Sequence, residues 1–388
     1  MTGFLDSLKP MHARLPAVVE PVYMTTRSRY ILLLITIATV YISVGFAHDD
    51  NRPIAGAIYW PGWTENSKWA NNLKPKEWNS RLPFYAKVSQ ARFEVRSDNQ
   101  AVMDQEIKYA KDAGLDYFAF DFSSDEKGTG LPLFLASKYK DEINFCVLLL
   151  GDNKKGAWPD TVKYLVRLFA EPTYQKVIGG RPLVFRYYVE RMAEEFGSAR
   201  AAREALDYLR SETVKVGLKA PYIVAQMWNA QDGAKYADTM GFDALSAYSM
   251  SVDVETFQEK EYPYSRLAKI NHDFWDACKG TGKEVIPIVN AGWDVRPRWW
   301  DKDLMKLYNG GEQPWFTAPT PSELANNIRD AIQWNRQNPA AGRANAVLIY
   351  AWNESDEGGW LVPTVSEGTG RIDAIKKVMS ELPRTGHP

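Results

Sequence analysis

The stretch NAVLIYAWNESDEGG, residues 345–359, decides the fold. Its first half is an apolar run of strand length, which predicts a strand buried on both faces, as in parallel sheets. Its second half places Glu354, Asp356 and Glu357 directly after that strand and follows them with two glycines. Carboxylates next to a buried strand are costly unless something uses them. The stretch therefore predicts a functional site at the end of a core strand.

Seven other stretches have the same form, a short apolar run that ends in polar or aromatic residues. They are residues 53–60, 114–122, 143–150, 181–188, 222–228, 242–249 and 284–293. Segments with helical spacing lie between them, including 98–114 and 198–217. Another helix is expected after Thr320, where Pro321 and Glu323 complete an N-terminal capping signal. Eight βα repeats predict an α/β fold, a (β/α)8 TIM barrel.

A doubly wound open sheet is the alternative fold. Such a sheet usually has a glycine-rich phosphate turn after its first strand, and YWPGWTENSK, residues 59–68, does not supply one. No low-complexity linker divides the region, so one barrel domain is expected over residues 48–388. Two long loops, 61–97 and 294–320, are rich in tryptophan, tyrosine and proline. Long loops at the carboxyl end of a barrel are expected to build a substrate site.

An apolar leader precedes this domain. The segment SRYILLLITIATVYISVGFA, residues 28–47, follows Arg27 and ends in a small-x-small pattern of the kind signal peptidase accepts. Residues 1–47 are therefore expected to be a signal peptide, of ordinary length if translation starts at Met24. The alternative is an uncleaved membrane anchor over residues 30–47. Both predict a barrel outside the cytoplasm, either secreted or periplasmic, or anchored to the membrane.

Composition excludes several classes of function. The net charge of −1 over 388 residues argues against nucleic acid as a partner, which requires a basic excess. Only four histidines are present, and three of them lie near the termini or just after the leader. A histidine zinc site is therefore not expected, and neither is any other metal or cofactor. With 14 tryptophans and 20 tyrosines, the chain suits an uncharged ligand with flat apolar faces, such as a sugar. A monomer is expected.

The strand ends combine aromatic rings, carboxylates and amides, with no serine–histidine pair, cysteine nucleophile or phosphate cradle. The expected substrate-binding residues are Tyr59, Trp60, Trp63, Asp121, Trp228, Tyr248, Trp293, Asp294, Arg296 and Asn353. The expected catalytic residues are Glu354 and Glu357. Rings and amides fit a pyranose, and paired carboxylates fit cleavage of an acetal, which needs an acid for the leaving oxygen and a second carboxylate.

Structural roles are the alternative for each of these residues. Trp60 and Trp352 could plug the mouth of the barrel, and Asp121 could hold a loop by accepting backbone N–H bonds. The pair Arg296 and Arg298 could form a solvated face or could neutralise Asp294. The two glutamates could cap the last helix or pair with Arg371.

Three segments resemble a known family. NAGWDVRPRWW (290–300), AWNESDEGGWLVPT (351–364) and AIYWPGW (57–63) are similar to the marks of the WbsX-like domain and the related glycoside hydrolase family 99. The resemblance spans about residues 53–382 and is most specific in the second segment. It implies a (β/α)8 barrel, and the characterised members of family 99 are endo-acting, retaining α-mannosidases.

The resemblance also implies roles for the glutamate pair. Glu357 would be the general acid that protonates the departing sugar and later the base that activates water. Glu354 would take the proton of the substrate's 2-hydroxyl, whose oxygen would attack the anomeric carbon. The tryptophan and histidine that the family has between its glutamates are Ser355 and Asp356 here. The sugar contacts therefore differ, and a glycosidase is better supported than a mannosidase.

The sequence thus predicts an exported glycoside hydrolase that cleaves an oligo- or polysaccharide with retention through the 2-hydroxyl. One alternative is a non-catalytic carbohydrate-binding surface protein that has kept the barrel. Another is a sugar transferase, as the WbsX label indicates. The lack of a nucleotide-phosphate signal and the export leader count against the transferase.

Overall fold

The structure is a computed structural model that describes residues 52–65, 67–122, 130–151, 156–251, 258–306 and 313–382. The leader expected over residues 1–47 lies outside these ranges, so its role stays a prediction. Among the helices of the described ranges, none has the length and apolar character needed to cross a bilayer.

Eight strand positions form one parallel, closed sheet. They are β1 (Ile54–Tyr59), β4 (Tyr117–Phe122), β5 (Asn144–Leu149), β7 (Arg181–Arg186), β8 (Tyr222–Gln226), β9 (Ala244–Ser246), the pair β11 (Glu284–Val285) and β12 (Ile288–Asn290), and β14 (Ala346–Tyr350). Neighbours pair in this order, β9 with β11, β12 with β14, and β14 with β1. All eight predicted strands are confirmed. The seventh is interrupted next to Pro287, because proline has no N–H to donate to a ladder.

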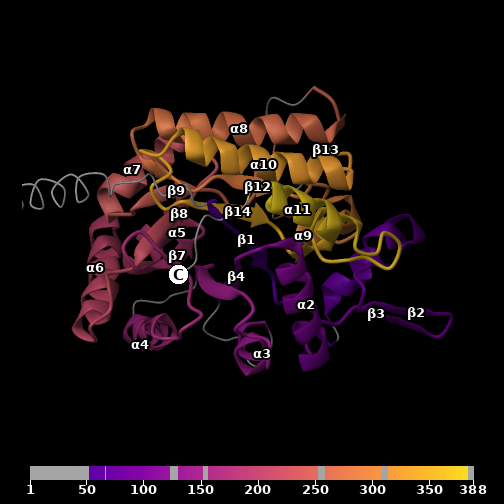
Figure 1. Cartoon of the computed structure of the whole chain (residues 1–388), viewed down its shortest axis with the longest axis horizontal. Coiled ribbons are helices and arrows are strands. Elements are labelled where there is room, and N and C mark those ends of the chain that lie inside the picture. The colour runs from indigo at the N-terminus through magenta and orange to yellow at the C-terminus, as the bar shows by residue number, and fades with distance from the viewer. Residues whose placement is uncertain are drawn as a thin grey trace, which may run out of the picture. The chain divides into compact units, whose positions relative to one another are not determined.

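Helices cover the outside of the sheet (Figure 1). They are α2 (Gln100–Ala113), α3 (Leu131–Ala136), α4 (Trp158–Phe169), α5 (Val189–Phe196), α6 (Ala199–Lys215), α7 (Ala230–Met240), α8 (Tyr264–Gly280), α9 (Lys302–Met305), α10 (Pro321–Gln337) and α11 (Gly370–Glu381). Helix α10 begins with the predicted capping box, in which Thr320 and Glu323 bond each other's backbone N–H. In Figure 1, α8 and α10 lie side by side, and α11 packs against α10 and α2. The fold is a (β/α)8 barrel, as predicted.

The long loop after β1 has structure of its own. It contains the 3-10 helices η1 (Lys68–Leu73) and η2 (Lys76–Arg81) and a hairpin of β2 (Lys87–Ser89) and β3 (Arg92–Glu94). The loop after β12 contains the 3-10 helix η3 (Arg296–Arg298) and strand β13 (Trp315–Phe316), which pairs with β10 (Glu261–Tyr262). A short strand β6 (Lys176–Val177) pairs with β7. Both loops predicted to build the site therefore contain short helices and strands.

A glycine sets the position of a barrel-filling tyrosine. The ring of Tyr117, at the start of β4, occupies the space where residue 56 of β1 would have its Cβ, which would come within 2.3 Å of the ring. The Tyr117 hydroxyl donates to the carbonyl of Val347 at 3.0 Å. Only glycine at position 56 allows this packing, because interiors are filled to near crystal density. The Tyr117 ring thus fills space at the start of β1 and β4, and active sites of such barrels lie at the opposite, carboxyl ends of the strands.

Tyr59 does not reach the barrel mouth. It was expected to line the substrate site, but the structure buries its side chain between the sheet and α2, where its ring packs on Phe118. Its hydroxyl donates to Glu106 Oε2 at 2.8 Å, and the indole N–H of Trp352 donates to Glu106 Oε1 at 3.0 Å. The alternation of side chains along β1 explains this, because successive residues face opposite sides of a strand.

Glu106 makes the stability of this contact dependent on pH. Burial raises the pKa of Glu106 from its ordinary value of 4.5 to about 8, although the hydrogen bonds from Tyr59 and Trp352 lower it. The folded protein therefore holds this proton more strongly than the unfolded chain does. The contribution of Glu106 to stability is complete below pH 4.5 and is lost as the pH rises towards 8.

Glu106→Gln is expected to remove the loss of stability that Glu106 causes as the pH rises. Between pH 5.5 and 7.5, the free energy of unfolding of the parent should fall relative to that of the variant by up to about 1.4 kcal/mol per pH unit. Urea unfolding at several pH values measures the difference in slope. Asp112→Asn, at an exposed position of the same helix, is the control. Equal slopes for Glu106→Gln and the parent would contradict a titrating Glu106.

Candidate active site at the barrel mouth

The two glycines after Glu357 explain how the loop after β14 folds. Strand β15 (Asn353–Glu354) pairs with β16 (Gly359–Trp360), and the 3-10 turn η5 (Ser355–Glu357) joins them. Gly358 has a φ of +86°, and a Cβ there would lie 2.6 Å from the backbone nitrogen of Asp294. A Cβ at Gly359 would lie 2.4 Å from the ring of Tyr350. Glycine is therefore required at both positions for the loop to pack closely over the end of the barrel.

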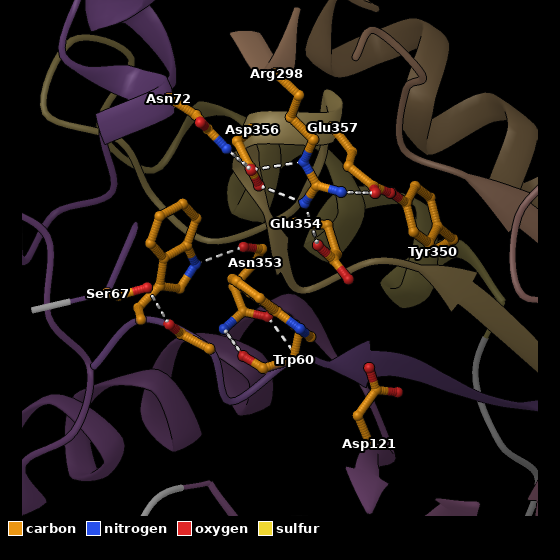
Figure 2. Close-up of polar contacts among 12 residues, drawn as sticks. Trp60, Ser67, Asn72, Asp121, Arg298, Tyr350, Asn353, Glu354, Asp356 and Glu357 are labelled. Carbon is orange, nitrogen blue, oxygen red and sulfur yellow. Dashed lines mark hydrogen bonds and ion pairs between the residues drawn. The ribbon is translucent and has the colours of Figure 1, made fainter. Parts of the chain in front are cut away.

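Arg298 is the centre of the site. Its Nε donates to Asp356 Oδ2 at 2.7 Å and its Nη2 to Asp356 Oδ1 at 3.0 Å, which makes a bidentate pair. Its Nη1 pairs with Glu357 Oε1, and its Nη2 lies 3.7 Å from Glu354 Oε2. Figure 2 shows the guanidinium lying among the three carboxylates. The guanidinium also lies over the ring of Trp69, 4.7 Å from its centroid.

Asp356 anchors this arginine. Asp356 is fully buried. In addition to the hydrogen bonds from Arg298, its carboxylate accepts one of 2.7 Å from Asn72 Nδ2 of η1. Neither Arg298 nor Asp356 nor Asn72 was among the expected site residues. The signal for two of them was present, because Asp356 lies between the glutamates and Arg298 belongs to the 290–300 segment. Nothing in the sequence indicated Asn72, which the loop after β1 brings to the site.

The glutamates do not use the structural partners considered for them. Arg371 instead donates to the carbonyl of Trp360 at 2.7 Å and to Glu367 at 3.2 Å. Helix α11 begins at Gly370, beyond the loop. The ion-pair partner of both glutamates in the described structure is Arg298.

Glu354 is linked to Asp121 through one hydroxyl. The hydroxyl of Tyr248 lies 2.8 Å from Glu354 Oε1 and 2.8 Å from Asp121 Oδ2. A hydroxyl has a single proton to donate, so the second contact is a hydrogen bond only when one of the carboxyl groups is protonated. Burial, followed by the charge of Glu357, raises the pKa of Glu354 well above its ordinary value, against the lowering effect of Arg298. One additional proton on either carboxyl group therefore makes both contacts hydrogen bonds.

Glu357 lies in a different environment. Its side chain is 12% exposed, against 5% for Glu354, so it is the more accessible of the two. Its Oε2 accepts the hydroxyl of Tyr350, and its backbone carbonyl accepts the N–H of Asp294 at 2.6 Å. The ring of Trp293 lies 5.9 Å from that of Tyr350. Trp293 thus packs near the tyrosine that bonds Glu357, and its contact with substrate stays a prediction.

Asn353 and Trp63 are engaged with the protein itself. The Asn353 side chain bonds the backbone of Trp60 twice, with Oδ1 accepting its N–H at 2.9 Å and Nδ2 donating to its carbonyl at 2.7 Å. The indole N–H of Trp63 donates to the Asn353 carbonyl at 2.8 Å, and the Trp63 side chain is fully buried. Both were expected to contact substrate. They join the end of β1 to the loop after β14 instead, because buried polar groups must be paired. Only the ring of Trp60, packed edge-on against Trp69, is partly exposed.

Asp294 is neutralised by two arginines. Arg296 donates to both of its oxygens at 2.8 Å, and Arg81 pairs with Oδ2. Burial alone would raise the pKa of Asp294, but the hydrogen bonds from Arg296 and the charge of Arg81 outweigh it and lower the pKa. The structure therefore shows the structural alternative for Arg296, whereas Arg298 pairs with Asp356 and Glu357. The ion pair of Arg296 and Asp294 adjoins the Glu357 backbone, because the backbone N–H of Asp294 donates to the Glu357 carbonyl.

Aromatic rings also lie next to Glu354, because Tyr248, which bonds it, belongs to an aromatic cluster. Tyr187 stacks on Tyr248 with centroids 4.6 Å apart, and Trp228 contacts Tyr187 at 5.6 Å. Trp228 is 46% exposed, so its face is available at the rim. The structure thus brings together six of the twelve expected residues, namely Asp121, Tyr248, Glu354, Glu357, Trp293 and Trp228. Their roles in binding and catalysis stay predictions.

Two solved structures share this fold. Both are of the GH99 endo-alpha-mannosidase from Bacteroides thetaiotaomicron. The one in complex with BIS-TRIS-Propane has a TM-score of 0.55 at 14% identity, and the match covers 86% of this chain and 97% of that chain. The other has a TM-score of 0.53 at 13% identity, with 86% and 98% covered. At such identity the likeness shows a common barrel fold.

No curated protein matches the chain. The profile of the family described as "Glycosyltransferase WbsX" matches residues 138–375, which is more than half of the chain. This match includes the segments 290–300 and 351–364 and confirms the resemblance. The chain belongs to the glycosyltransferase WbsX family.

Proposed function

We propose that the chain is a glycoside hydrolase that cleaves an oligo- or polysaccharide with Glu354 and Glu357. The observation that carries this is the pair of carboxyl groups at the barrel mouth in unlike environments. Glu354 is buried and is connected to Asp121 through the Tyr248 hydroxyl, whereas Glu357 is more accessible and pairs with Arg298. Two carboxyl groups in unlike environments at one barrel mouth can divide the acid and base roles. To act as the acid, Glu357 must exchange its ion pair with Arg298 for a proton when the glycan binds. The likeness to a solved endo-alpha-mannosidase supports the same reading.

The proposed first step moves two protons. Glu357, as the acid, gives its proton to the glycosidic oxygen, and the bond from that oxygen to the anomeric carbon breaks. Glu354, as the base, takes the proton of the sugar's 2-hydroxyl, and the 2-oxygen bonds to the anomeric carbon. In the second step, water opens this anhydro-sugar, Glu357 takes a proton from the water, and Glu354 returns its proton to the 2-oxygen. Both carboxyl groups are restored, and the net reaction is hydrolysis with retention.

Tyr248 provides a route by which Glu354 becomes a base. With the proton on Glu354, the carboxyl donates to Tyr248 and the hydroxyl donates to Asp121. With the proton on Asp121, the same two contacts reverse direction and Glu354 is ionised. The two 2.8 Å distances permit either arrangement without movement of the heavy atoms. Binding of a 2-hydroxyl beside Glu354 favours the second arrangement, because an ionised carboxylate is the better acceptor.

A reducing-end assay tests the proposal. The chain from residue 48 onwards is incubated with a panel of α-mannans, α-glucans and other glycans, and new reducing ends are measured. Cleavage of at least one glycan is expected, with the α configuration retained by NMR, and a substrate without its 2-hydroxyl should not be cleaved. Measurable affinity without any release would instead support a carbohydrate-binding protein. Ready cleavage of a 2-deoxy substrate would rule out the 2-oxygen step.

A sugar transferase is the second candidate, and the description of the family favours it. The same glutamate pair could serve, because the anhydro-sugar can be opened by a sugar hydroxyl in place of water. Products longer than the substrate, formed when an acceptor sugar is added to the reaction, would identify transfer. The apolar leader supports export, so we further propose that the enzyme acts outside the cytoplasm, either free or held by residues 30–47.

A further inference from the structure

A hollow of about 610 Å³ lies beside the candidate active site. This volume is in the range of small-molecule binding sites. Helices η2 and η3 and their flanking residues form its walls, and we call it the tryptophan groove. Its lining residues are Pro75, Glu77, Trp78, Arg296, Pro297, Trp299 and Trp300.

The rings of the groove are held in place. The guanidinium of Arg296 lies 5.3 Å from the Trp78 ring and 4.2 Å from that of Trp315. Trp299 packs edge-on against Trp315 at 5.8 Å. Trp300, by contrast, is 55% exposed. A large ring kept exposed on such a supported surface indicates an interaction site, because covering it would remove apolar area from water.

Two features connect the groove to the active site. Arg298, which holds the catalytic loop, lies in the chain between Pro297 and Trp299 of the groove. The indole N–H of Trp300 donates to Asn72 Oδ1 at 3.1 Å, and Asn72 Nδ2 donates to Asp356 at 2.7 Å. One asparagine thus joins the wall of the groove to the floor of the site. A ligand that extends beyond the site on this side would meet Trp300.

We propose that the tryptophan groove binds further sugar units of the glycan whose bond is cleaved at Glu354 and Glu357. This inference rests on the proposed function. The apolar face of a pyranose would stack on Trp300, and the carboxylate of Glu77 would accept bonds from its hydroxyls. The lining has one negative charge, on Glu77, and one positive charge, on Arg296, so the groove offers no excess charge for an ionic ligand. An uncharged glycan therefore fits better than a peptide or a phosphate.

Two substitutions at one position separate stacking from positioning. Trp300→Ala removes both the ring and the N–H that bonds Asn72, whereas Trp300→Phe keeps a ring and loses only the N–H. Tyr208→Ala is the control, because Tyr208 of α6 is also an exposed ring, at 39%, and lies on a different part of the barrel. Affinity for short and long α-mannan and α-glucan oligosaccharides is measured by calorimetry in a Glu357→Gln background, so that the ligands stay intact.

Trp300→Ala is expected to weaken binding of long oligosaccharides about tenfold, with short ones changed less than about twofold. Trp300→Phe and Tyr208→Ala should bind both as the parent does. The groove proposal would be overturned if the affinity of the parent did not rise with the length of the oligosaccharide. It would also be overturned if Trp300→Ala and Trp300→Phe lost affinity equally, because the effect would then arise from the lost hydrogen bond to Asn72. Neither result depends on turnover. Binding that meets these expectations without any cleavage by the parent would overturn the proposed function alone.

Discussion

Glu357→Gln is expected to lower kcat at least about 100-fold on any glycan that the parent enzyme cleaves, because general acid–base catalysis contributes that much or more. The amide has the shape of the carboxyl group and can still accept a bond from Arg298. It cannot give a proton to the glycosidic oxygen or take one from water. Since the substitution removes proton transfer and leaves the rings and amides of the site in place, affinity for the glycan should change little.

The measurement is kcat from initial rates of reducing-end release, with affinity from calorimetry. Glu204→Gln, on the exposed surface of α6, is the matched control for loss of one acidic charge. A urea unfolding curve for each variant shows whether loss of the ion pair with Arg298 has unfolded the protein. A folded Glu357→Gln protein with the turnover of the parent would end the hydrolase proposal for this pair.

The barrel and the glutamate pair could be predicted because both follow from local patterns. Each of the eight strands is an apolar run with a polar end, and α10 carries its capping residues in adjacent positions. Carboxylates after a buried strand are conspicuous for the same reason. Chain position alone also placed Asp121 and Tyr248 at strand ends, and the structure brings them to Glu354.

What could not be predicted is which side chains a residue at the barrel mouth would bond. Tyr59 and Trp63 are strand-end aromatics like Trp228, yet they are buried because partners distant in sequence, Glu106 and Asn353, receive their polar atoms. Such pairs depend on how loops fold over the barrel. The same holds for Arg298, whose neighbours are set by the packing of η3 against η5.

Arg298→Met is expected to destabilise the protein by about 3–5 kcal/mol, the cost of leaving a buried charge without its partner. Asp356 is fully buried and would lose two of the hydrogen bonds that the structure gives it, keeping the one from Asn72. Glu354 and Glu357 would then face each other's charge without the arginine between them. Urea unfolding at pH 7 measures the loss.

Asp356→Asn in the Arg298→Met background tests the cause. If the unpaired charge of Asp356 is responsible, neutralising it should recover much of the lost stability, so the effects of the two substitutions will not add. Arg200→Met, which removes an exposed arginine paired with Glu204, should change little. A double variant no more stable than Arg298→Met would show that the arginine acts mainly through Glu354 and Glu357. In that case its loss should also shift the pH dependence of turnover, because Arg298 lowers the pKa of Glu354.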